Sequence, residues 1–310
     1  MNTFALTVMM YHYIRDPGDA AGMGSGIAGL PVARFDAQLD DLTRRYEMIS
    51  WADLRDGLLG SDRGAALPSQ ACLLTFDDGV RDHYLNAFPA LRARNLSGLF
   101  FALARTEGDG LALGHKIQLL LARLGPQDLR QAVWSRLTPD RRQAFVWAEE
   151  RYAASDHAGL VEVAEVEVLK LVLQRELSRD AEGILGELTA KHVGPEAEVA
   201  DEFYLTQHQV AEMAAEGMHF GGHSRNHPWF DWVGAEGQTQ EIEASAAWLR
   251  RIDPGPWPFA YPYGGYSAES PALLQAGGFA AAFTTEPKTV HVDPFLIGRM
   301  DGELLMADGR

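Results

Sequence analysis

The 310-residue sequence contains one cysteine, Cys72, so no disulfide can form within a single copy of the chain. Because Cys72 lies in an apolar run, we interpret it as a small core residue and not as a nucleophile. No apolar run approaches the ~20 residues that cross a bilayer. The first ten residues also lack the basic segment and small-residue cleavage site of a signal peptide. These absences predict a cytoplasmic protein without a membrane span.

Positive charge is also scarce. Lys and Arg together number 27 against 43 Asp and Glu, which gives a formal net charge of −16. Nucleic acids and anionic membrane surfaces are bound through basic faces, so the charge balance argues against both as partners. With 46% hydrophobic residues and no internal repeat, the chain suits one large α/β domain with an insertion. Nothing in the sequence specifies an oligomeric state.

Short apolar runs alternate with segments of helical spacing along most of the chain. Parallel strands joined by right-handed crossovers are therefore expected. The predicted strands are residues 4–11, 71–76, 98–103, 218–222, 257–262, 279–284 and 295–301. The predicted helices are residues 35–42, 51–59, 81–94 with Leu85, Phe88 and Leu91 inward, 206–216 with Thr206 as N-cap, 236–251 and 271–276.

From about residue 107 to residue 200 the composition shifts to Ala, Leu, Glu, Arg and Gln, with stops at Gly125-Pro126 and Gly194-Pro195. This stretch predicts four or five helices inserted into the α/β domain. Long insertions at a functional face often shape the substrate site, so we expect this one to lie beside it.

Two adjacent acids, Asp77 and Asp78, follow the apolar run 71–76 and precede Gly79. Like charges this close raise each other's pKa unless a cation or a donor separates their roles, and a metal ion on one of them is the simplest relief. Taken alone, the triplet is equally consistent with a turn that only caps the next helix.

Two imidazoles, His223 and His227, follow the predicted strand 218–222 at a spacing of four residues. On a helical turn this spacing directs both rings to one side, as two ligands of a Zn²⁺ site require. The alternative is a pair of histidines at a helix start, satisfied by backbone carbonyls.

The stretches Thr75-Phe76-Asp77-Asp78-Gly79 and His223-Ser224-Arg225-Asn226-His227 together resemble the signature of the polysaccharide deacetylase family, the NodB-homology domains of carbohydrate esterase family 4. A third stretch, 259–264, resembles the family's Arg-x-Pro-Tyr-Gly element. The three occur in the family's order. The resemblance implies a distorted (β/α)7-type barrel with a helical insertion at about 107–200, in a single NodB-like domain spanning residues 1–310.

By this resemblance, Asp78, His223 and His227 would be the ligands of a divalent metal ion, Zn²⁺ or another such as Co²⁺. Asp77 would be the general base that takes a proton from the attacking water. The chain departs from the family in two places. The arginine that braces the catalytic aspartate is replaced by Ala260, and the family's C-terminal Leu-x-His, which supplies the acid, is not evident.

Three residues are candidates to fill these gaps: His12, at the end of the first predicted strand, His291 and Arg299. His12 is equally consistent with a satisfied core histidine, and His291 with an exposed bystander. We expect Arg299, which arrives on the last predicted strand, to hydrogen-bond Asp77 and hold it ionised. An ordinary surface pair between Arg299 and its neighbour Asp301 is the alternative.

The function implied by the resemblance is metal-dependent hydrolysis of an N-acetyl group from an amino sugar or polysaccharide, with a carbohydrate as substrate. One alternative is removal of a formyl or O-acetyl group from a soluble or lipid-linked sugar precursor. The other is a catalytically inactive carbohydrate-binding relic, although a binding module has no need of a base at Asp77. The aromatic residues Trp229, Phe230, Trp232 and Tyr266 could stack on a sugar ring if they are exposed.

Overall fold

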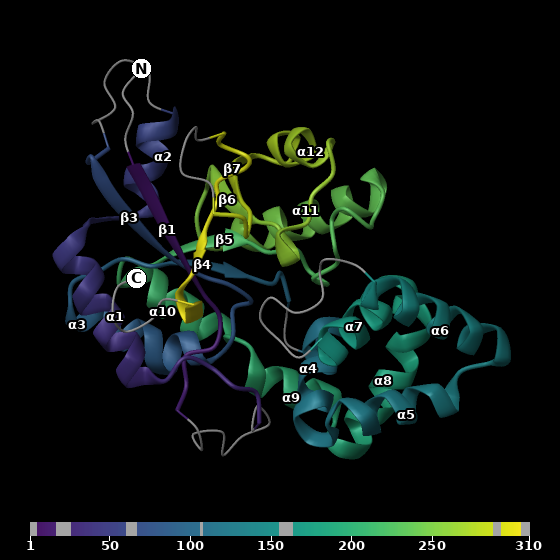
Figure 1. Ribbon diagram of the computed structural model, residues 1–310. Coiled ribbons are helices and arrows are strands. Elements are labelled where there is room, and N and C mark those ends of the chain that lie inside the picture. The colour runs from purple at the N-terminus through teal and green to yellow at the C-terminus, as the bar shows by residue number, and fades with distance from the viewer. Residues whose placement is uncertain are drawn as a thin grey trace. The chain divides into compact units, whose positions relative to one another are not determined.

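The computed structural model describes residues 5–16, 26–59, 67–105, 108–154, 164–287 and 293–304. This part of the chain forms two compact units, of which one holds the strands and the other is helical (Figure 1). No helix among the described residues is long and apolar enough to cross a membrane.

The first unit is built on a parallel sheet in the order β7-β6-β5-β4-β3-β1-β8, with β2 paired to β3 beside this path. Every pairing is parallel, which confirms the predicted α/β class and distorted barrel. The strands are β1 (Ala5–Tyr11), β2 (Glu47–Ile49), β3 (Gln70–Phe76), β4 (Leu99–Ala102), β5 (His219–Gly222), β6 (Trp257–Ala260), β7 (Phe279–Phe283) and β8 (Met300–Asp301).

The last segment of the sheet differs from the predicted strand 295–301. Ile297 forms an isolated parallel bridge with Phe283 of β7, and its N–H donates to Ala282 O at 2.9 Å. Three residues later, Met300 and Asp301 pair with β1. The segment therefore changes partner midway, which explains why only two residues keep strand geometry. It connects the two end strands of the sheet and carries Arg299 between them.

Apart from the predicted helix 81–94, each predicted helix of the first unit is present. Thr206 is the N-cap of its helix, with its Oγ1 accepting from Gln209 N and Gln209 Oε1 accepting from Thr206 N, as a capping box requires. The helices are α1 (Val32–Arg45), α2 (Trp51–Leu59), α3 (Phe88–Ala93), α10 (Gln207–Ala215), α11 (Ala235–Leu249) and α12 (Ser270–Ala276), with 3₁₀ turns at Pro262–Gly264 and Gly302–Leu304.

The predicted helix 81–94 is wrong in its first half. A π-helical turn, His83–Ala87, precedes α3. A π turn holds more residues than an α turn, so positions counted at 3.6 residues per turn leave the buried face. Phe88 and Leu91 are buried as expected, whereas Leu85 is 57% exposed.

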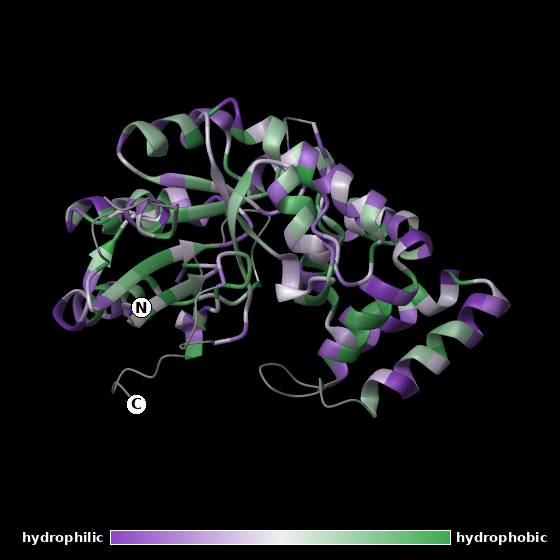
Figure 2. Cartoon of the chain, turned by 90° about the horizontal axis from the view of Figure 1, so that it is seen from above, coloured by the Kyte–Doolittle hydropathy of each residue, from purple (hydrophilic) through white to green (hydrophobic). Residues whose placement is uncertain are grey.

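The core of the first unit is centred on β3, which is buried from Ala71 to Phe76 on both faces. The Phe76 ring stacks on Phe100 of β4 at 4.6 Å and on Tyr11 of β1 at 5.5 Å. Strands covered on both faces read as continuous apolar runs. Figure 2 shows this contrast, with strands mainly green and helices striped purple and green.

Among its described residues, the second unit contains six α-helices where four or five were predicted, together with a π turn at Val172–Glu176. The predicted stop is present at Gly125, whose φ is 76°, and Pro126 begins the next helix. The predicted place of these helices beside the substrate site stays a prediction. They are α4 (Leu113–Leu124), α5 (Pro126–Arg136), α6 (Pro139–Ala153), α7 (Ala164–Leu171), α8 (Ser178–His192) and α9 (Glu196–Phe203).

His83 provides a test of the fold. Burial lowers the pKa of this fully buried imidazole to about 4, and its Nε2 lies 2.9 Å from His12 O. The unfolded chain therefore binds more protons than the folded one between pH 6.5 and 4. We expect the free energy of unfolding to fall by roughly 3 kcal/mol as the pH drops through this window. In a His83→Gln variant this part of the loss should be absent, as measured by urea denaturation at pH 7 and pH 4.5. An identical loss in both proteins would contradict the assignment.

Candidate metal centre

The two acids stand at the carboxyl end of β3. Asp77 donates its N–H to Tyr11 O at 2.9 Å, which continues the pairing with β1, and both carboxylates are buried. The chain then turns sharply, with φ 74° at Asp78 and 64° at Gly79. A Cβ at Gly79 would lie 2.7 Å from the Cβ of Ala102 on β4, so only glycine fits this turn.

The two histidines follow β5, but the expected helical turn between them is wrong. Residues 223–227 form a non-helical loop with a bend at Arg225 and Asn226, and φ is 64° at Ser224 and 56° at His227. Ser224 Oγ accepts from His227 N at 2.9 Å, and Ser224 O accepts from Ala104 N at 2.8 Å. The left-handed residues fold the loop back on itself and bring the two rings together at a centroid distance of 4.7 Å.

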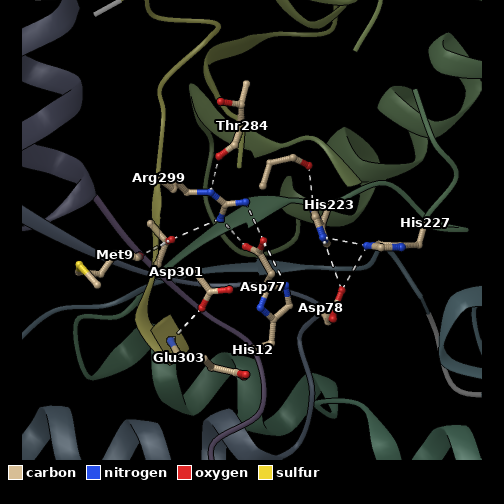
Figure 3. A network of polar contacts seen from close by, with 12 residues as sticks. Met9, His12, Asp77, Asp78, His223, His227, Thr284, Arg299, Asp301 and Glu303 are labelled. Carbon is tan, nitrogen blue, oxygen red and sulfur yellow. Dashed lines mark hydrogen bonds and ion pairs between the residues drawn. The ribbon is translucent and has the colours of Figure 1, made fainter. Parts of the chain in front are cut away.

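Asp78, His223 and His227 converge as predicted (Figure 3). Asp78 Oδ1 lies 3.5 Å from His223 Nε2 and 3.3 Å from His227 Nε2, and the two Nε2 atoms are 3.1 Å apart. Ligand atoms at 2.0–2.1 Å from a tetrahedral Zn²⁺ are roughly 3.3 Å from one another. The buried carboxylate and imidazoles therefore fit one divalent ion in both chemistry and spacing.

The main chain of β6 fixes the orientation of His223. His223 Nδ1 lies 2.8 Å from Ala260 O, so this nitrogen carries the proton and Nε2 faces the site. Burial alone would lower the pKa of His223, but the charges of Asp77 and Asp78 outweigh it and raise the pKa. The pocket thus attracts a positive charge, which a metal ion would supply in place of a proton.

Arg299 makes the predicted contact with Asp77. Its Nη1 and Nη2 donate to Asp77 Oδ1 and Oδ2 at 2.6 and 2.7 Å, a bidentate pair in which both partners are buried. Nε donates to Thr284 O at 3.0 Å, and Nη1 also lies 3.3 Å from Thr75 Oγ1. The expected alternative, a surface pair with Asp301, is excluded by this burial.

The charge of Arg299 sets the ionisation of Asp77. Burial would raise the pKa of Asp77, but the adjacent guanidinium, His223 and the hydrogen bonds from Arg299 together hold it below its usual value. A carboxylate has about four lone-pair sites, so the bidentate pair leaves room for another donor.

His12 follows the last residue of β1 and lies on the side of Asp77 opposite Arg299 (Figure 3). Its Nε2 is 3.9 Å from Asp77 Oδ2, and its side chain is 34% exposed. His12 is therefore not a core histidine and can reach both Asp77 and solvent. The other histidine candidate, His291, lies outside the described residues.

Aromatic side chains pack beside the candidate metal ligands. The Tyr263 ring lies 4.4 Å from His227, and Trp229 stacks on Tyr263 at 4.3 Å. Trp232 is 47% exposed, as a sugar contact requires, whereas Phe230 is fully buried and is not available. The partly buried Tyr266 packs 5.4 Å from Tyr261.

Strained backbone gathers at this site. Among the described residues, five non-glycine residues have positive φ, and four of them are Asp78, Ser224, His227 and Tyr263. Such residues cost roughly 1–3 kcal/mol each and cluster at functional sites. Sequence reasoning placed Tyr263 only in a family-like stretch. Its conformation, together with the Gly264 that follows, becomes visible only in the fold.

Asp78, His223 and His227 thus form a candidate site for one divalent ion in an α/β fold of parallel strands. A family model described as polysaccharide deacetylase matches residues 184–282, which include His223 and His227 but not Asp77 and Asp78. The predicted resemblance to the polysaccharide deacetylase family is thereby confirmed over these residues, and the fold brings the two aspartates to the part of the chain that the family model matches. No curated protein matches the chain.

Solved deacetylase structures share the fold. The Streptococcus pyogenes deacetylase PplD in complex with acetate is 18% identical, with a TM-score of 0.57 over 97% of this chain and 93% of its own. IcaB from Ammonifex degensii is 19% identical, with a TM-score of 0.57 over 96% and 91%. The de-N-acetylase from Aggregatibacter actinomycetemcomitans is 14% identical, with the same TM-score over 98% and 97%.

The metal site predicts that His223→Ala removes a bound ion. This substitution deletes one of the three ligands and leaves Asp78 with one imidazole. Metal content after gel filtration should fall from one ion per chain to a small fraction. The His219→Ala variant, from the start of the same strand, is the control and should keep its metal. Full metal content in His223→Ala would contradict the ligand assignment.

The Arg299 pair predicts a change in pH dependence. Without the guanidinium the pKa of Asp77 rises, so in Arg299→Met the ionised carboxylate is lost at higher pH than in the parent. The acidic limb of kcat/KM against pH should therefore move upward while the metal stays bound. Because an unpaired buried charge costs about 3–5 kcal/mol, Arg299→Lys serves as a milder second variant with a smaller shift. An unmoved acidic limb in both variants would refute the role.

Proposed function

We propose that this protein removes N-acetyl groups from an amino sugar or amino-sugar polymer by metal-dependent hydrolysis. The observation that carries the proposal is that two adjacent acids at the end of one strand have different partners. Asp78 joins His223 and His227 in a metal-sized triangle, and the preceding residue, Asp77, is a buried carboxylate held ionised by Arg299. An ion-binding site alone would not need the second acid.

Amide hydrolysis requires a nucleophile, a means of carrying the oxyanion, and a proton for the departing amine. A divalent ion held by Asp78, His223 and His227 would acidify water and polarise the acyl oxygen. We assign Zn²⁺ to the site because one carboxylate and two imidazoles suit a borderline-soft cation, with Co²⁺ as a substitute.

Asp77 is the proposed general base. The role is supported by the ion pair with Arg299, which maintains its charge, and by its buried position next to Asp78. Once it has accepted a proton, the carboxyl remains hydrogen-bonded to Arg299, which keeps it in place for the next turnover.

His12 is the proposed general acid. It faces Asp77 at 3.9 Å and is partly open to solvent, so it can exchange protons between turnovers. Its main-chain carbonyl accepts from His83 Nε2, and the neighbouring Ile14 O accepts from Asn86 Nδ2 at 2.7 Å. The π turn before α3 thus anchors the segment that carries His12.

Of the two alternatives from the sequence, the binding relic is less well supported. A binding relic has no use for a buried, bidentate Asp77–Arg299 pair, whose assembly carries a desolvation cost. A different acyl group, formyl or O-acetyl, would use the same residues, so a screen for acetate and formate release from N-acylated and O-acylated sugars separates these activities.

Asp77→Asn is the most direct test of the mechanism. The amide cannot accept the proton of water at neutral pH, so kcat should fall by about 10²-fold or more while the metal stays bound. Acetate release from a short N-acetylated amino-sugar oligomer and metal content are measured together. Asp78→Asn is the companion variant and should lose both the metal and the activity. If Asp77→Asn releases the metal and Asp78→Asn keeps it, the two roles are exchanged.

A further inference from the structure

We propose that Glu241, on α11, is a positioning residue that sets the geometry of the metal ligand His227. This inference rests on the proposed metal site and adds to it a carboxylate from a different element of the fold. Glu241 lies 14 residues beyond His227 in the sequence, and no motif includes it.

Glu241 binds the loop between the two histidines through three hydrogen bonds. Its Oε2 accepts from the main-chain N–H groups of Arg225 at 2.7 Å and Asn226 at 2.9 Å. Its Oε1 accepts from Asn226 Nδ2 at 2.7 Å. Hydrogen bonds to a charged acceptor are shorter and stronger than those between neutral groups.

These bonds act where the loop is strained. Arg225 and Asn226 lie between Ser224 and His227, which both have left-handed φ values. Left-handed backbone at non-glycine residues persists only when the surroundings over-determine it. At the start of the loop Ser224 Oγ accepts from His227 N, and Glu241 holds the middle.

The position of Glu241 follows from the packing of α11 on the sheet. Gly222, the last residue of β5, has no side chain, and a Cβ there would lie 3.1 Å from Ser245 Cβ on α11. This close approach brings the helix onto the carboxyl end of β5. Glu241 is one helical turn before Ser245, whose Oγ donates to Glu241 O at 2.9 Å, so its side chain extends over residues 225 and 226.

The ligand triangle is sensitive to this loop. His227 Nε2 lies 3.3 Å from Asp78 Oδ1 and 3.1 Å from His223 Nε2, so a small displacement of the loop opens the triangle. His223 is fixed independently by Ala260 O. Glu241 therefore acts on His227 and leaves His223 in place. Residues that orient metal ligands commonly change metal affinity by 10–100-fold when substituted.

The test measures metal affinity directly, by competition between the full-length protein and a chromophoric zinc chelator. Glu241→Ala is expected to raise the Zn²⁺ dissociation constant by about 10-fold or more. The absorption spectrum of the Co²⁺-substituted protein should also change, because it reports the ligand geometry. Glu243→Ala is the matched control, since Glu243 is exposed on the same helix, and it should leave both readouts unchanged.

A swap of partners makes the test specific. In Glu241→Gln the amide nitrogen faces the donor Asn226 Nδ2, so that hydrogen bond is lost. Adding Asn226→Asp supplies an acceptor, and the double variant should recover affinity relative to Glu241→Gln alone. Both Glu241→Gln and the double variant keep the size of the parent side chains, so they address the question even if Glu241→Ala does not fold.

The variant Ile242→Val tests whether Glu241 has only a structural role. It shortens a buried side chain next to Glu241 and leaves the loop residues unchanged. If this variant loses as much thermal stability as Glu241→Gln and as much metal affinity, the proposal is overturned. It is also overturned if Glu241→Ala binds Zn²⁺ within twofold of the parent. Because binding is measured without substrate, failure of the deacetylase function would leave these results readable.

Discussion

The buried pair between Asp77 and Arg299 is the interaction on which the rest of the site depends. Asp77 and Asp78 are adjacent and both buried, and two neighbouring carboxylates in such surroundings need opposite charge close by. Arg299 satisfies Asp77, and the imidazoles, with an ion in the proposed site, would satisfy Asp78. Each acid thus has its own partner, which is the basis for the two different roles that we propose for them.

The pair also imposes a requirement on the fold. Arg299 stands in the segment that pairs first with β7 and then with β1, so its side chain enters from between the two end strands. Thr284 O and Thr75 Oγ1 fix the guanidinium from both sides, and Thr75 Oγ1 in turn donates to Met9 O at 2.6 Å. The same segment thus connects the two ends of the sheet and supplies the positive charge that neutralises Asp77. Weakening this segment would affect both.

Local strain is the second constraint. The left-handed residues at the site are held by contacts from elsewhere: Gly79 presses against Ala102, and the histidine loop is bound by Ser224 and by Glu241 of α11. A site built from such loops gains fixed ligand directions at a cost in backbone energy of roughly 1–3 kcal/mol per residue. The parallel sheet beneath supplies the rigidity that tolerates this cost.

The sequence predicted those features whose signal is local or chemical. Apolar runs located most strands, and the need to neutralise Asp77 without an arginine at 260 pointed to Arg299, which the structure brings to it. The three-residue strand β2 was missed because it is too short to carry a period. Leu85 was misplaced because a π turn shifts the helical phase. Glu241 was missed because its contact depends on how α11 packs against Gly222, which is a tertiary property.

The presence of Ala260 where an arginine was expected has a physical explanation in the packing around Arg299. Ala260 is fully buried in the cluster that includes Phe101, and the Arg299 guanidinium lies 5.6 Å from the Phe101 ring. A second arginine at 260 would bring another positive charge into this buried space, where Arg299 already supplies the guanidinium that binds both oxygens of Asp77. The two positions are therefore alternative sources of one guanidinium. What position 260 retains is its carbonyl, which orients His223 whatever the side chain, so this candidate metal ligand is held by the main chain while the partner of Asp77 is free to come from another segment.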